Sequence, residues 1–190
     1  MIAVARQTGE TQHSDQVLRL GDIDHKAIAA LLARHGLNLI TVADSAAIPG
    51  SYWGEPEAGV IADCVFARAD TPVHSILHEA SHLIVAGPER RAAIHTDASV
   101  CDREEDATCY LQIVLADALP GVGRDRLMTD MDRWGYSFRL GSTRAWFEQD
   151  ADDAHDWLLQ RRLLSSSSDH SGAQTTIRAA PNLAAGGGRV

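Results

Sequence analysis

The sequence lacks the features that define several common classes of protein. Its 190 residues include only 3 cysteines, an odd number that provides no disulfide framework. No hydrophobic run approaches the ~20 residues that a membrane-spanning helix needs. Residues 1–16 contain no hydrophobic core of a signal peptide. We therefore expect a cytoplasmic protein whose cysteines are reduced.

Positive charge is also scarce. The chain has 17 Lys and Arg residues against 26 Asp and Glu residues, which gives a net charge of −9 at pH 7. Nucleic acids and anionic membrane surfaces attract basic proteins, so this excess of negative charge predicts neither kind of partner. The sequence gives no indication of the oligomeric state.

The composition along the chain indicates one domain between two less ordered ends. Residues 1–21 are polar, and we expect them to form a flexible N-terminal segment. Residues 165–190 are rich in serine, alanine and glycine and contain no aromatic residue, which predicts a disordered tail. Residues 22–164 remain as a single domain that is long enough to bury a core.

The most informative motif of that domain is His78-Glu79-x-x-His82. It lies in the middle of a predicted helix over residues 72–86, which we expect to end at Gly87. Residues four apart lie on one face of a helix, so the two imidazoles can bind one metal ion. Glu79 projects about 100° round the helix, beside the open position of the metal, where it can act as a general base.

A solvent-exposed helix face is the alternative explanation for these histidines. His74 lies one turn before His78, on the same face as His82. We expect His74 to be a cleft or surface residue and not a ligand. The combination of two histidines at this spacing with an acid after the first favours a metal site over a solvated face.

A third ligand has to come from elsewhere in the chain. Val85 and Pro88 occupy the positions at which the metzincin pattern requires glycine and histidine, so that class is excluded. A glutamate on a second helix is the other common solution. Residues 101–119 predict such a helix and begin with an acidic cluster.

Two glutamates of that cluster are candidates. Glu104 shares the apolar face of the helix with Leu111, and a buried carboxylate is costly unless it is paired or bound to metal. Glu105 shares a polar face with Thr108 and Gln112. We therefore predict Glu104 as the third ligand and keep Glu105 as the alternative.

The helix motif and the segment Glu104-Glu105-Asp106-Ala107 resemble the glutamate-type zinc metallopeptidases, or gluzincins, including the ImmA/IrrE-type peptidases. Those enzymes pair an HExxH helix with a Glu-x-x-Ala segment on the next helix. The resemblance implies a zincin-like α+β fold, in which the two ligand helices pack with a small mixed or antiparallel sheet. A short strand lines the substrate cleft of that family, and residues 60–66 are its candidate here. Ser81 departs from the glycine that usually precedes the second histidine.

Residues 76–91 resemble a second family more closely, the bacterial elongation factor P hydroxylases. The shared residues include Ser81 before His82 and the pair Arg90-Arg91. This resemblance implies iron(II) held by two histidines and one carboxylate on the same type of helix. The match is specific over this short stretch only.

These observations leave three hypotheses about function. The preferred one is a metal-dependent hydrolase of a peptide or protein substrate, in which His78, His82 and Glu104 bind Zn²⁺. Glu79 is then the general base that activates a water molecule for attack on the amide. The first alternative is a non-haem iron hydroxylase in which the same ligands hold Fe²⁺. The second is a non-catalytic binding module that the metal stabilises. Imidazole and carboxylate ligands suit both ions, so the motif does not choose between them.

Overall fold

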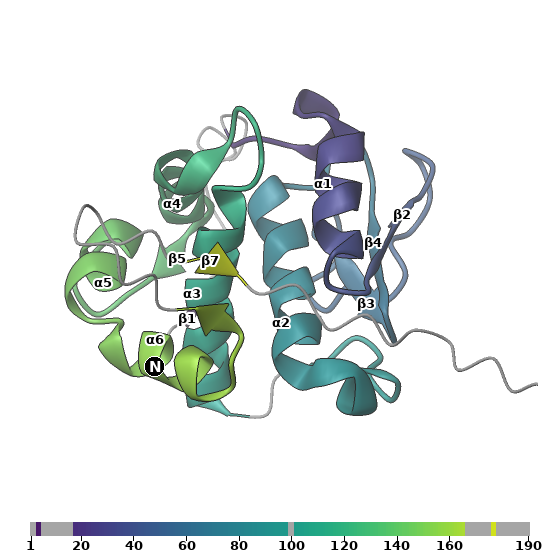
Figure 1. The fold of residues 1–190 in the computed structure, drawn as a ribbon. Helices are drawn as coiled ribbons and strands as arrows, with labels where there is room; N and C mark the ends of the chain where they lie inside the picture. Colours follow the sequence, from purple (N-terminus) through teal and green to yellow (C-terminus); the bar gives the residue numbers. More distant parts are fainter. Residues whose placement is uncertain (1–2, 5–16, 99–100, 166–175, 178–190) are drawn as a thin grey trace, which may run out of the picture.

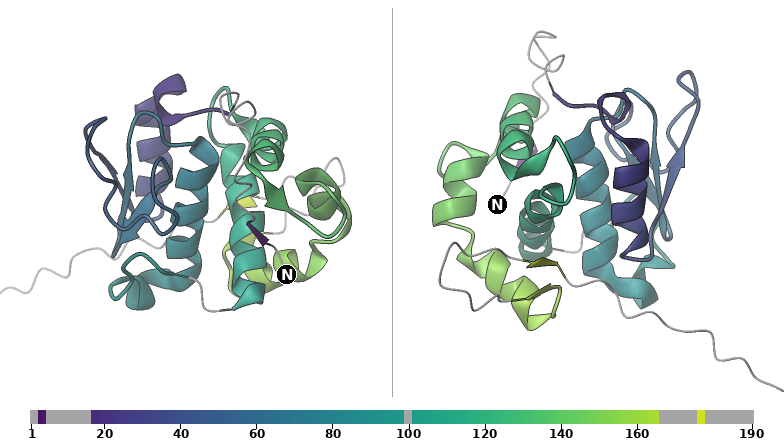
Figure 2. Two further views of the ribbon diagram at one scale, coloured as in Figure 1. Left: turned by 180° about the vertical axis from the view of Figure 1, so that it is seen from behind. Right: turned by 45° about the horizontal axis from the view of Figure 1, so that its top comes forward.

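Two adjacent helices form the centre of the molecule. The computed structural model describes residues 3–4, 17–98, 101–165 and 176–177. Helices α2 (Val73–Arg91) and α3 (Asp102–Ala116) pack against each other along much of their lengths. A small sheet and helix α1 lie on one side of this pair, and helices α4 to α6 lie on the other (Figure 1). The two further views show the same arrangement (Figure 2).

The sheet has three strands in the order β2-β4-β3. β2 (Asn38–Thr41) pairs in parallel with β4 (Cys64–Ala67), and β3 (Gly59–Ile61) pairs with β4 in the antiparallel sense. The prediction of an α+β protein with a small mixed sheet is therefore confirmed. Residues 60–66, expected to form one strand, instead form a tight hairpin, because the chain turns at Ala62 with a positive φ of 52°.

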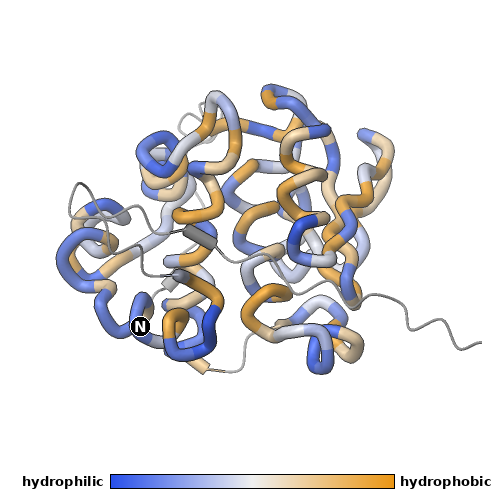
Figure 3. Tube along the Cα trace, viewed as in Figure 1, coloured by the Kyte–Doolittle hydropathy of each residue, from blue (hydrophilic) through white to orange (hydrophobic). Residues whose placement is uncertain are grey.

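The hydrophobic core fills the space between the central helices and the elements on both sides. Hydrophobic residues recur along α1, α2 and α3, while hydrophilic residues gather on the outer helices and the connecting turns (Figure 3). Complete burial of a large aliphatic side chain contributes roughly 1.5–3 kcal/mol. Fully buried examples are Leu31, Leu77, Leu83, Leu111 and Ile113.

The HExxH helix ends in the way that its sequence predicts. Gly87 has φ 73° and ψ 165°, which interrupts the helical path, and Pro88 follows it. A glycine adopts this left-handed conformation without the steric cost that a Cβ atom brings. The helical turn beyond the kink carries Arg90 and Arg91, so the end of α2 is displaced from the axis of the part that bears the motif.

The remaining elements complete the two sides of the molecule. Asp24 caps α1 by accepting a hydrogen bond from the backbone N–H of Lys26, and Ser142 caps α5 by accepting one from Ala145. Among the described residues, no helix combines the length and the apolar character that crossing a membrane requires. The bounds of these elements are α1 His25–Ala33, α4 Gly123–Trp134, β5 Tyr136–Ser137, α5 Thr143–Gln149 and α6 Asp152–Gln160, and Leu20–Asp22 form a short 3-10 helix.

The packed part of the chain begins before residue 22, where the sequence placed its boundary. Leu20 is fully buried, and its backbone N–H donates to the carbonyl of Thr71 at 2.8 Å. A leucine in an otherwise polar stretch was a weak signal, and only the tertiary structure shows that it is buried. The rest of the predicted flexible ends lies outside the described residues, except for three short strands. These are β1 (Ala3–Val4), which pairs with β5, and β6 (Leu164–Ser165), which pairs with β7 (Thr176–Ile177).

Candidate metal centre

Two histidines on successive turns of α2 face helix α3. His78 and His82 are both buried, with exposed fractions of 9% and 6%. Their Nε2 atoms lie 3.1 Å apart, and the two rings stand nearly perpendicular at 85°. The spacing of four residues therefore brings both imidazoles to one point, as the sequence predicts.

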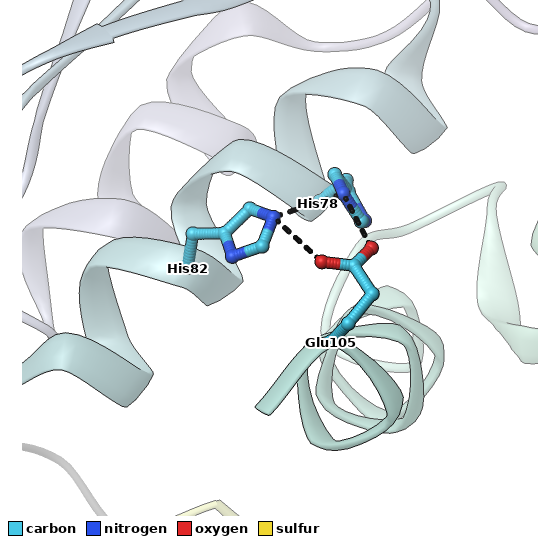
Figure 4. A group of neighbouring side chains, drawn as sticks. All are labelled: His78, His82 and Glu105. Carbon is cyan, nitrogen blue, oxygen red and sulfur yellow. Dashed lines mark hydrogen bonds and ion pairs between the residues drawn. The ribbon is translucent and has the colours of Figure 1, made fainter. Parts of the chain in front are cut away.

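The carboxylate at this point belongs to Glu105. One of its oxygens lies 3.4 Å from Nε2 of His78, and the other lies 3.4 Å from Nε2 of His82 (Figure 4). His78, His82 and Glu105 are the one such group of three metal-binding side chains within the described part of the chain. The third candidate ligand is thus the residue that the sequence analysis kept as the alternative.

Glu104, the preferred ligand in the sequence analysis, points elsewhere. It is buried, as its place on the apolar face predicts, but its carboxylate forms an ion pair with Arg90. A buried carboxylate needs a positive partner, and the end of α2 supplies a guanidinium in place of a metal ion. The preference for Glu104 is therefore corrected in favour of Glu105.

The polar face of α3 is buried against the histidines. Gln112 and Thr108 are completely buried, seven and three residues after Glu105. The side chain of Gln112 lies 2.7 Å from Nδ1 of His78, and the hydroxyl of Thr108 lies 3.3 Å from Nδ1 of His82. The helical spacing of Glu105, Thr108 and Gln112 shows in the sequence that they share one face. Because all three residues are polar, the sequence suggested that this face was exposed to solvent.

These contacts determine which nitrogen of His78 carries the proton. The amide of Gln112 donates to the sulfur of Met131 at 2.9 Å, so its oxygen accepts a hydrogen bond from Nδ1–H of His78. Nε2 of His78 then presents its lone pair to the centre. Burial, with the nearby His78 and Arg90, lowers the pKa of His82 well below its ordinary value. A neutral imidazole is the form that binds metal ions.

The spacing of the donor atoms fits a small divalent cation. Ligand atoms that lie ~2.0–2.2 Å from a tetrahedral zinc ion are roughly 3.2–3.6 Å from one another. The observed separations of 3.1, 3.4 and 3.4 Å are close to that range. Two nitrogen lone pairs and a carboxylate that converge in a buried place repel one another unless a proton or a cation lies between them. The residues therefore fit a divalent ion.

Glu79 follows His78 on α2 and is buried with it. Burial raises the pKa of its carboxyl well above the usual range, and the charges of Glu57, Glu105 and Asp97 raise it further. A raised pKa favours the protonated form of this carboxyl, which can donate a proton.

An aromatic wall from the α4–β5 region closes the centre on one side. The ring of Tyr136 lies 6.1 Å from that of His78 and 5.6 Å from that of His74, edge to face in both cases. The indole N–H of Trp134 donates to Glu57 at 3.1 Å. Enclosure and the nearby carboxylates raise the pKa of the Tyr136 hydroxyl well above its ordinary value, so it stays a hydrogen-bond donor.

His74 is not among the converging side chains. It is almost completely buried, and it packs against Trp134 with a ring separation of 5.1 Å. Burial, with the nearby His78, lowers its pKa to about 3, so this ring is neutral throughout the physiological range. We expected a residue in a cleft or at the surface; His74 is instead buried, because Trp134 and Tyr136 of α4 and β5 cover this face of α2.

Ser81 has a local structural role at the position where the peptidase family usually has glycine. Its side chain is fully buried, and its hydroxyl donates to the carbonyl of Leu77 at 2.7 Å. This bond within the helix satisfies the buried hydroxyl without help from another element. The departure at Ser81 therefore leaves the ligand geometry intact.

Replacement of Glu105 by glutamine is expected to lower metal affinity by at least about 100-fold, since loss of a group that merely orients a ligand already costs 10–100-fold. Replacement of Glu104 by glutamine is expected to retain the metal and to destabilise the fold by about 1–3 kcal/mol, through loss of its charged bond to Arg90. Titration calorimetry and thermal unfolding of the two variants separate these effects. A larger loss of metal affinity in Glu104→Gln would return the ligand role to that residue.

The two resemblances rest on the short motifs described above, and the chemistry of the site is independent of them. Comparisons with protein-family models, with curated proteins and with solved structures find no match for this chain.

Proposed function

We propose that this protein is a zincin-like, metal-dependent hydrolase that cleaves amide bonds in a peptide or protein. In this proposal His78, His82 and Glu105 hold one divalent ion, with zinc as the first candidate. The observation that carries the proposal is the convergence of three donor atoms from two helices, at separations of 3.1–3.4 Å, beside the buried carboxyl of Glu79. A purely structural helix face has no need of a buried acid at that position.

A divalent ion in such a site acts as a Lewis acid and makes water a better nucleophile. Glu79 has the chemistry to accept a proton from the attacking water and to deliver it to the leaving nitrogen of the amide. Burial and the neighbouring carboxylates raise its pKa, which favours the protonated form that delivers the proton to the nitrogen. Hydrolysis of an amide needs such a proton donor, because an amine is expelled poorly as its anion.

The surrounding residues keep this arrangement rigid. Gln112 and Thr108 contact the outer nitrogens of the two histidines, which restrains both rings. The Arg90–Glu104 ion pair ties the end of α2 to the first turn of α3, directly beside Glu105. A site built on two packed helices is held more precisely than one built on loops.

Metal analysis of the full-length protein, purified anaerobically and without added metal, tests the proposal. We expect close to one zinc ion per chain, together with hydrolysis of a quenched fluorescent peptide library that a chelator abolishes. Bound iron(II) with oxygen-dependent turnover would instead favour the hydroxylase chemistry that the resemblance of residues 76–91 implies. Bound metal without turnover in either assay would favour the binding module.

A further inference from the structure

The edge of the three-stranded sheet that lies nearest to α2 is already occupied by the chain itself. The N–H of Val60 in β3 donates to the carbonyl of Gly50 at 3.2 Å, and the carbonyl of Val60 accepts from Thr96 at 3.0 Å. Gly50 approaches so closely that a Cβ atom there would lie 2.4 Å from the Val60 oxygen. An extended peptide therefore has no free backbone groups to pair with on β3.

A different strand borders the metal centre. β5 carries Tyr136, whose ring packs against that of His78 at 6.1 Å. The same ring lies 5.6 Å from that of His74, so Tyr136 packs against the motif-bearing part of α2. A peptide that paired with β5 would therefore lie beside a residue that contacts a candidate ligand.

The structure shows that the β5 edge accepts an extended segment. Residues 3 and 4 of the same chain form β1 and pair with it in the antiparallel sense, with Ala3 opposite Ser137 and Val4 opposite Tyr136. Only two residues of each strand take part. An isolated two-stranded ribbon of this size is marginally stable in water, so another segment can replace β1.

The charge of the segment also suits this protein. The chain as a whole carries a net charge of −9 at pH 7, so long-range repulsion disfavours an acidic peptide. Residues 1–9, Met-Ile-Ala-Val-Ala-Arg-Gln-Thr-Gly, contain one arginine and no acidic residue. The chain's own segment therefore has the composition that the net charge favours.

We propose that the backbone of β5, at Tyr136 and Ser137, is the edge on which this protein holds an extended, neutral or basic peptide, and that residues Ala3–Val4 occupy this edge in cis and compete with it. The identification of this peptide as a substrate rests on the proposed function. Recognition would follow the general mode in which a peptide adds a strand to a sheet edge, with main-chain hydrogen bonds as the common feature. The internal segment would then lower the apparent affinity of the site for peptides by the fraction of time that it occupies the edge.

The test uses the full-length protein and the segment itself as the probe. A synthetic peptide of residues 1–9, labelled with fluorescein at its C-terminus, is titrated with wild-type protein and with the double variant Ala3→Pro, Val4→Pro. Proline has no N–H to donate, so the variant cannot form the β1 ladder. The double variant Thr11→Pro, Gln12→Pro is the matched control, because it carries the same number of prolines outside β1.

The double variant at positions 3 and 4 is expected to bind the probe at least about fivefold more tightly than the wild type and the control. Hydrogen exchange should show that the bound probe protects the amides of residues 136–137. A probe that is N-methylated at its third and fourth residues should bind to none of the proteins. Equal affinities for all three proteins, absence of binding to the variant at positions 3 and 4, or protection elsewhere in the chain would overturn the proposal. Binding is measured here without turnover, so a failure of the hydrolase proposal would leave this test unaffected.

Discussion

Replacement of Glu79 by glutamine is expected to leave the metal bound and to lower the rate of amide hydrolysis by about 10²–10⁴-fold, the usual contribution of a general base. Glutamine is nearly isosteric with glutamate, so α2 and both imidazoles should stay in place. The amide side chain cannot accept the proton of the attacking water. The measurement is the cleavage rate of a quenched fluorescent peptide at saturating metal, with the metal content determined on the same sample.

Glu89→Gln is the matched control for this variant, since Glu89 lies on α2 beyond the kink and is exposed to solvent. We expect its cleavage rate to equal that of the wild type. An unchanged rate in Glu79→Gln, with metal bound and the wild type active, would refute the role of Glu79 as the general base. Loss of metal in Glu79→Gln would show that this carboxyl supports the ligands and would leave its catalytic role without support.

His78→Ala and His82→Ala are each expected to reduce the metal content to less than about a tenth of the wild-type value, because two remaining protein ligands compete poorly with water for a divalent ion. The same loss should appear in thermal unfolding. A ligand present at 100 times its dissociation constant stabilises a protein by about 2.7 kcal/mol, and neither variant should gain this stabilisation when zinc is added.

His25→Ala serves as the control, because His25 lies on α1, is exposed and is remote in sequence from the motif. Its metal content and its response to zinc should match those of the wild type. Both ligand histidines are buried, so circular dichroism is needed to establish that the alanine variants are folded. A folded variant that keeps the wild-type metal content would remove that histidine from the ligand set.

Several features of the site could be predicted from the sequence because they depend on one helix alone. The spacing of His78 and His82 fixes their common face whatever the helix packs against. Gly87 and Pro88 end the motif-bearing part of α2 through backbone conformation, which is also a local property. The α+β class follows in the same way from local patterns, whereas the hairpin at Ala62 depends on a turn that has no glycine or asparagine to signal it.

The third candidate ligand was decided by tertiary structure. The sequence placed Glu104 on the apolar face of α3, and the structure buries that face as expected. However, α3 packs against α2, α4 and α6, so Thr108 and Gln112 on its polar face are buried as well, and Glu105 is half-buried. A helix pattern distinguishes one apolar face from one polar face, but it cannot show that a polar face meets the imidazoles of another helix. It also could not show that Arg90, beyond the kink of α2, neutralises Glu104 and so leaves Glu105 to complete the group.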